Sequence, residues 1–94
     1  MKDKLNFYID GSWVKSESKE KIAVINPANE ELIGHISSGT KDDINKAVLA
    51  ASNAFKTYQL TSKEDRIELL NNIISEYKNR YDDLVQTITE EMGA

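Results

Sequence analysis

The sequence predicts a small α+β fold in which two short hairpin-like pairs of strands precede two amphipathic helices. Strand-forming residues are concentrated between about residues 6 and 37, and turn signals divide them into short pieces. From about residue 41 onward, apolar residues recur instead at the three- and four-residue steps of a helix. The 94 residues fit one unit, so we expect a single segment spanning 1–94.

The first pair of strands is predicted at residues 6–9 and 12–15. Both stretches are rich in aromatic and β-branched residues, and Asp10-Gly11 lies between them. This dipeptide is the strongest short signal for a two-residue hairpin turn. The polar residues 16–20 are then expected to form a loop that buries nothing.

The second pair of strands is predicted on either side of Pro27. Proline lacks the N–H that a sheet ladder needs, so Pro27 belongs at the end of a strand and not in its middle. Asn29 tolerates left-handed backbone geometry, which suits a turn. Asn26 could hold a ligand, but capping of this turn is the favoured interpretation. The segment therefore forms a strand, a turn and a returning strand.

Two helices are predicted, at about residues 41–58 and 62–92. Thr40 can begin the first helix, because Asp43 three residues later completes a capping box. Either of two pairs, both S/T-x-x-D/E in pattern, can begin the second helix: Thr61 with Glu64, or Ser62 with Asp65.

The second helix carries a long apolar stripe. Side chains at steps of three and four residues fall on one face for about 30 Å. Heptad spacing is compatible with a coiled coil, but Ile73 and Val85 widen the stripe and favour packing on a larger body. Two short hairpins cannot cover this face, so we expect a partner surface. The stripe consists of Ile67, Leu70, Ile74, Tyr77, Tyr81, Leu84 and Ile88.

Composition argues against several kinds of partner and several kinds of catalytic site. The net charge of −4 argues against nucleic acid as a partner, and no apolar run approaches the ~20 residues of a membrane span. The first ten residues lack the apolar core of a secretory leader, so a cytoplasmic location is expected. The chain has no cysteine, and its single histidine, His35, lies in a predicted strand. We assign no catalytic or cofactor-binding residue.

Four stretches in register resemble the N-terminal portion of the aldehyde dehydrogenase family. They are "YIDGSWV", "VINPANEELIGHI", "GTKDDINKAVLAASNAF" and the final "TSKEDRIELLNNIISEYKNRYDDLVQTITEEMGA". Together they cover the chain from about Phe7 onward. The resemblance implies that this region is the outer part of an α/β Rossmann-like cofactor-binding domain.

The resemblance also implies a function for a longer protein. Family members oxidise aldehydes to carboxylic acids with NAD or NADP, using a cysteine, a glutamate, an asparagine and a glycine-rich loop that belong to later segments. The 94-residue chain alone is therefore expected to be inactive and to bind no cofactor. We expect the partner surface to be the remainder of such a chain or, if the chain self-associates, another copy of it. A homo-oligomer is expected.

One site carries over from the family as a structural feature. The resemblance implies a monovalent cation held by the backbone carbonyls of Val24 and Ile25 and by the acid Glu91. The alternative to an enzyme segment is a stand-alone oligomerisation or protein-interaction module that uses the heptad face of the second helix.

Overall fold

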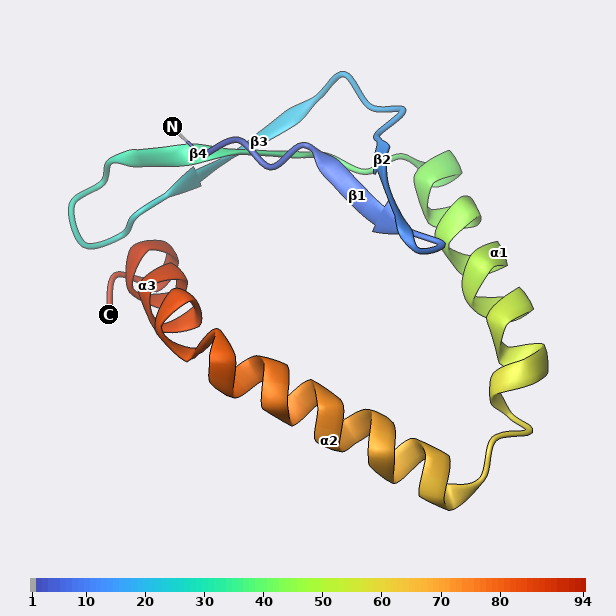
Figure 1. Cartoon of the computed structure of the whole chain (residues 1–94). Helices are drawn as coiled ribbons and strands as arrows, with labels where there is room; N and C mark the ends of the chain where they lie inside the picture. The colour runs from blue at the N-terminus through green and yellow to red at the C-terminus, as the bar shows by residue number, and fades with distance from the viewer. Residues whose placement is uncertain (1) are drawn as a thin grey trace.

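The computed structural model describes residues 2–94 and has the predicted order of strands followed by helices (Figure 1). The strands form two separate antiparallel pairs: β1 (Asn6–Ile9) with β2 (Ser12–Lys15), and β3 (Lys21–Ile25) with β4 (Leu32–Ser37). The helices are α1 (Lys41–Tyr58), α2 (Lys63–Asn79) and α3 (Tyr81–Met92). The chain is therefore α+β, as the sequence predicts.

The first hairpin confirms the turn signal. Asp10 and Gly11 both have positive φ angles, 55° and 77°, as a two-residue turn that follows the strand twist requires. Tyr8 lies opposite Trp13, and the centroids of their rings are 5.2 Å apart. The turn and this aromatic pair together fix the register of β1 and β2.

The second hairpin contains Pro27 in its turn, as predicted. The Asn26 side-chain oxygen accepts a hydrogen bond from the Ala28 amide at 2.9 Å, which confirms its capping role. The left-handed residue is Glu30, with φ of 62°, and not Asn29. Asn29 instead uses its side-chain oxygen to accept from the Glu31 amide at 3.0 Å. That contact fixes the turn with the left-handed step one residue later than expected.

The first two helices, α1 and α2, begin at capping boxes. The Thr40 hydroxyl accepts from the Asp43 amide at 3.2 Å, and the Asp43 carboxylate accepts from the Thr40 amide at 3.0 Å. Of the two boxes that the sequence offers for the second helix, the structure forms Ser62 with Asp65, and both hydrogen bonds measure 3.1 Å.

The expectation of one continuous helix over residues 62–92 is wrong, because the helix is divided at Arg80. Arg80 has φ of −111° and ψ of 19°, outside the helical region. Its amide still donates to the carbonyls of Glu76 and Tyr77, while its own carbonyl accepts from the Leu84 amide at 3.1 Å. One residue therefore ends α2 and begins α3.

Charge, and not glycine or proline, accompanies this break. Asp82 and Asp83 lie in the first turn of α3, where the helix dipole favours acids, and Lys78 lies in the last turn of α2. The apolar spacing runs on across the break, with the Tyr77 and Tyr81 rings 6.4 Å apart. Periodicity alone therefore did not reveal the division.

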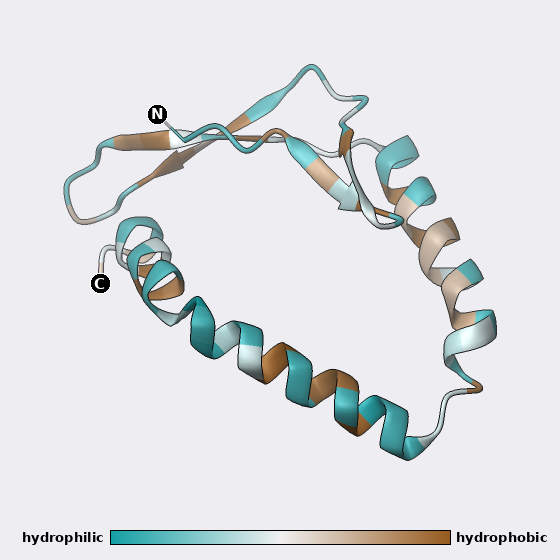
Figure 2. Cartoon of the chain, viewed as in Figure 1, coloured by the Kyte–Doolittle hydropathy of each residue, from teal (hydrophilic) through white to brown (hydrophobic). Residues whose placement is uncertain are grey.

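The elements form an open frame with an exposed apolar face. Among residues 2–94 no apolar side chain is buried, and the largest are exposed along all three helices. The radius of gyration is 16.9 Å, whereas a compact chain of this length has about 12 Å. Figure 2 shows apolar residues along α2 and on both hairpins. None of the helices described in residues 2–94 is long and apolar enough to cross a bilayer.

Candidate functional site

The C-terminal end of α3 lies against the turn of the second hairpin. Gly93 adopts a left-handed conformation, with φ of 71°, and caps the helix by donating its amide to the Thr89 carbonyl at 3.0 Å. A β-carbon at Gly93 would lie only 2.8 Å from the Ala28 amide nitrogen and 3.0 Å from Cγ of Pro27. The turn and the helix end, far apart in sequence, therefore form one junction.

A hollow of about 320 Å³ lies at this junction, lined by Lys2, Asn26, Glu31 and Glu90 among others. The Lys2 ammonium lies 2.8 and 3.0 Å from the two carboxylate oxygens of Glu90. The Gln86 amide donates to the same carboxylate at 2.9 Å. Hydrogen bonds from Gln86 and then Lys2 lower the pKa of Glu90. The hollow therefore combines polar oxygens with a protein ammonium.

The three residues predicted to hold a cation come from β3 and from the last turn of α3, and none of them lines the hollow. Val24 and Ile25 end β3 at a shift in strand register, and Glu91 lies in the last turn of α3 with an exposed side chain. Glu90, and not Glu91, lines the hollow. Within residues 2–94, no three acidic, histidine or cysteine residues gather into a metal cluster. The cation site stays a prediction.

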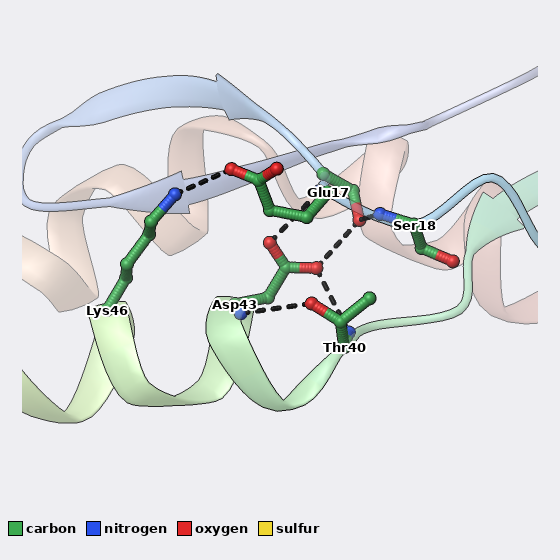
Figure 3. Close-up of polar contacts among 6 residues, drawn as sticks. Glu17, Ser18, Thr40, Asp43 and Lys46 are labelled. Carbon is green, nitrogen blue, oxygen red and sulfur yellow. Dashed lines mark hydrogen bonds and ion pairs between the residues drawn. The ribbon is translucent and has the colours of Figure 1, made fainter.

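A second polar cluster joins the loop after β2 to the start of α1 (Figure 3). Asp43 is 5% exposed, and its carboxylate accepts from the Ser16 hydroxyl at 2.7 Å, the Thr40 amide at 3.0 Å and the Glu17 amide at 3.2 Å. These bonds, led by the one from Ser16, lower the pKa of Asp43 to about 2. Lys46 pairs with Glu17 beside it at 2.7 Å.

This cluster was missed at the level of sequence. Residues 16–20 were expected to be a solvated loop, but Ser16 and Glu17 fix that loop to the helix. The capping box identifies Asp43 as a helix-start residue, yet nothing in its spacing indicates a partner 27 residues away. The cluster therefore positions two elements, the loop after β2 and the start of α1.

The single histidine makes a structural contact. His35 lies in β4 and is half-buried, with Nδ1 at 3.0 Å from a carboxylate oxygen of Asp3. The same oxygen accepts from the His35 amide at 2.9 Å, and these contacts lower the pKa of Asp3. His35 therefore ties the N-terminal residues to β4.

The break between α2 and α3 makes an apolar groove of about 520 Å³. Ile73, Tyr77 and Leu84 line it together with Arg80, so the groove includes part of the apolar stripe. All four side chains are exposed.

Comparison with known proteins gives one consistent result. The model of the aldehyde dehydrogenase family matches residues 13–94. A curated Staphylococcus aureus relative (strain bovine RF122 / ET3-1), provisionally named an aldehyde dehydrogenase, is 52% identical over all 94 residues. The chain spans about a fifth of the length of this relative, 20%.

Two solved structures share the fold. An aldehyde dehydrogenase from Bartonella henselae superposes with a TM-score of 0.97 at 38% identity, over 100% of this chain and 20% of that one. A mutant of aldehyde dehydrogenase C from Pseudomonas syringae, crystallised with NAD+ and octanal, superposes with a TM-score of 0.93 at 42% identity. That match covers 96% of this chain and 19% of the other.

Proposed function

Because the chain belongs to the aldehyde dehydrogenase family, we propose that it serves as the N-terminal structural segment of an enzyme that oxidises aldehydes to carboxylic acids with NAD or NADP. The chain matches the N-terminal fifth of such proteins. Its role is to supply an outer frame on which later segments pack. The alternative of a self-sufficient interaction module has no support in the comparisons.

One observation carries this proposal: the described residues bury no apolar side chain of their own. Burial of apolar surface is the main source of stability for a folded chain, about 25 cal/mol per Å². A chain that has no apolar core of its own therefore needs another part of the protein to cover its exposed apolar side chains. We propose that this body is the remainder of the cofactor-binding domain, of α/β Rossmann-like architecture, and that the 1–94 segment forms its outer part.

The chain's own residues do not carry the chemistry in this proposal. Aldehyde oxidation by the family's route needs a thiolate nucleophile, and the chain has no cysteine. When bound by later segments, NAD or NADP would accept the hydride. The 94 residues orient α1 through the Asp43 cluster and the end of α3 through Gly93. We further propose that the whole enzyme is a cytoplasmic homo-oligomer.

A composite enzyme tests the proposal directly. In it, this chain replaces the matching segment of wild-type Pseudomonas syringae aldehyde dehydrogenase C, a mutant of which was crystallised with NAD+ and octanal. We expect NAD+-dependent oxidation of octanal at a rate within about tenfold of the host. A tenfold change in rate corresponds to a change of ~1.4 kcal/mol in the activation barrier. NADH formation is followed by its absorbance.

Two controls complete this experiment. The host without its N-terminal segment should be inactive, since the body then lacks its frame, and the 94-residue chain alone should form no NADH. A folded composite with no activity would contradict the proposed role, and so would turnover by the purified chain alone.

We propose a structural monovalent-cation site formed by the Val24 and Ile25 carbonyls and Glu91. Carbonyl and carboxylate oxygens suit a hard cation, and Gly93, two residues after Glu91, lies against the turn that follows Ile25. Potassium chloride should raise the thermal midpoint of the composite more than choline chloride at equal ionic strength. Glu91→Gln should abolish that difference. A difference that persists in this variant would exclude Glu91 as a ligand.

A further inference from the structure

The residues before β1 run beside β4 and pair with it through backbone hydrogen bonds. The amides of Lys2 and Lys4 donate to the carbonyls of Ile33 and His35, each at 2.8 Å. Lys4 also forms a parallel bridge with Ile36. Figure 1 shows this N-terminal stretch alongside β4. It lies before residue 13, where the match to the family model begins, so the family model does not account for it.

Side chains fix this stretch to β4 as well. The Asp3 carboxylate accepts from the His35 amide and lies against the His35 ring, and the Ser37 hydroxyl donates to the Leu5 carbonyl at 2.6 Å. The backbone of Lys2 passes directly beside Gly34, which is buried. A β-carbon there would overlap the carbonyl of Lys2. Glycine at position 34 is therefore a condition for this arrangement.

The same stretch reaches the opposite end of the chain. The Lys2 ammonium lies 2.8 Å from a carboxylate oxygen of Glu90, in the last turns of α3. The lysine side chain is 61% exposed and the glutamate 26%, so the pair is partly shielded from water. One backbone thus contacts β4 while its first described side chain contacts α3.

We propose that residues 2–5 form a strap that holds the end of α3 against the β3–β4 hairpin. Backbone hydrogen bonds fix the strap to β4, and the Lys2–Glu90 ion pair connects it to α3. Gly93 alone would leave α3 in contact with the tip of the hairpin at Pro27 and Ala28. The strap adds a second contact in the hollow, so the helix end is fixed at two points and its rotation about the turn is restricted.

Hydrogen exchange in the composite enzyme, read by mass spectrometry, tests the strap. Lys2→Met removes the ion pair but leaves the backbone anchor, so peptides covering 86–93 should exchange about twofold to fivefold faster, while β4 is unchanged. Gly34→Ala displaces the strap itself, so both β4 and residues 86–93 should exchange at least about tenfold faster. Lys4→Met, at an exposed lysine on the same stretch, is the matched control and should change neither.

Two results would overturn the proposal. One is an unchanged exchange rate over residues 86–93 in both Lys2→Met and Gly34→Ala. The other is an increase in that rate in Lys4→Met equal to the increase in Lys2→Met. Deletion of residues 2–5 should reproduce the Gly34→Ala pattern, which guards against a local folding defect in that variant. Exchange requires no turnover, so an inactive but folded composite would count against the proposed enzyme role and leave the strap measurable.

Discussion

Gly93→Ala is expected to destabilise the composite enzyme by about 2–3 kcal/mol, measured as a fall in the free energy of unfolding in urea. Two costs add at this position. Gly93 has φ of 71°, which an L-residue adopts at a cost of about 1–2 kcal/mol. The new β-carbon would also lie 2.8 Å from the Ala28 nitrogen, so α3 or the turn has to move.

Gly11→Ala is a matched control for the first of these costs. Gly11 has a similar φ of 77°, but nothing lies within 4 Å of a β-carbon built there. We expect this variant to lose about 1 kcal/mol, from backbone conformation alone. The difference between the two variants measures the contact between α3 and the turn. Equal losses would show that the contact contributes nothing to stability.

Local signals predicted the strands and the first helix well, because each is specified by neighbouring residues. The Asp10-Gly11 turn and the Thr40–Asp43 capping box act over two or three positions, and β1, β2 and α1 have the expected bounds. The α+β order follows from the same signals. The four family motifs then identified the family without any structural information.

The break at Arg80 shows where periodicity is insufficient. A hydrophobic repeat reports which face of a helix is apolar, and it does not report whether the helix axis is continuous. No glycine or proline marks the position, and the apolar steps from Tyr77 to Tyr81 to Leu84 pass through it. The one local signal for a new helix start is the pair of acids at 82 and 83. That signal is weak, because acids are also common on the solvated face of a continuous helix.

Long-range polar contacts could not be predicted from the sequence for a different reason. The partners Ser16 and Asp43 are 27 residues apart, and Lys2 and Glu90 are 88 apart. Such pairs are set by how the elements meet in space, which one sequence does not reveal. The contact between Gly93 and Pro27, which are far apart in sequence, was not predicted for the same reason.

Asp43→Ala is expected to lower the thermal midpoint of the composite more than Asp42→Ala, its exposed neighbour in the same helical turn. Loss of the Asp43 carboxylate leaves the Ser16 hydroxyl and the Glu17 amide without their acceptor, at a half-buried site. Unmet donors are costly because they have also lost water. Asp42→Ala removes only a favourable charge at the helix start.

The charge of Asp43 also predicts how this stability depends on pH. The pKa of Asp43 falls from 3.8 to about 2 on folding, so the folded state favours the carboxylate. Its contribution is fully present above about pH 4 and is lost as the pH falls toward 2. Asp43→Asn keeps the shape, but its N–H group then faces either the Ser16 and Thr40 donors, which share one oxygen, or the Glu17 amide at the other oxygen. The gap in thermal midpoint between parent and Asp43→Asn should therefore be constant from about pH 8 to 5 and narrow below about pH 4. A gap that widens on acidification would show that the folded state does not favour the ionised carboxyl.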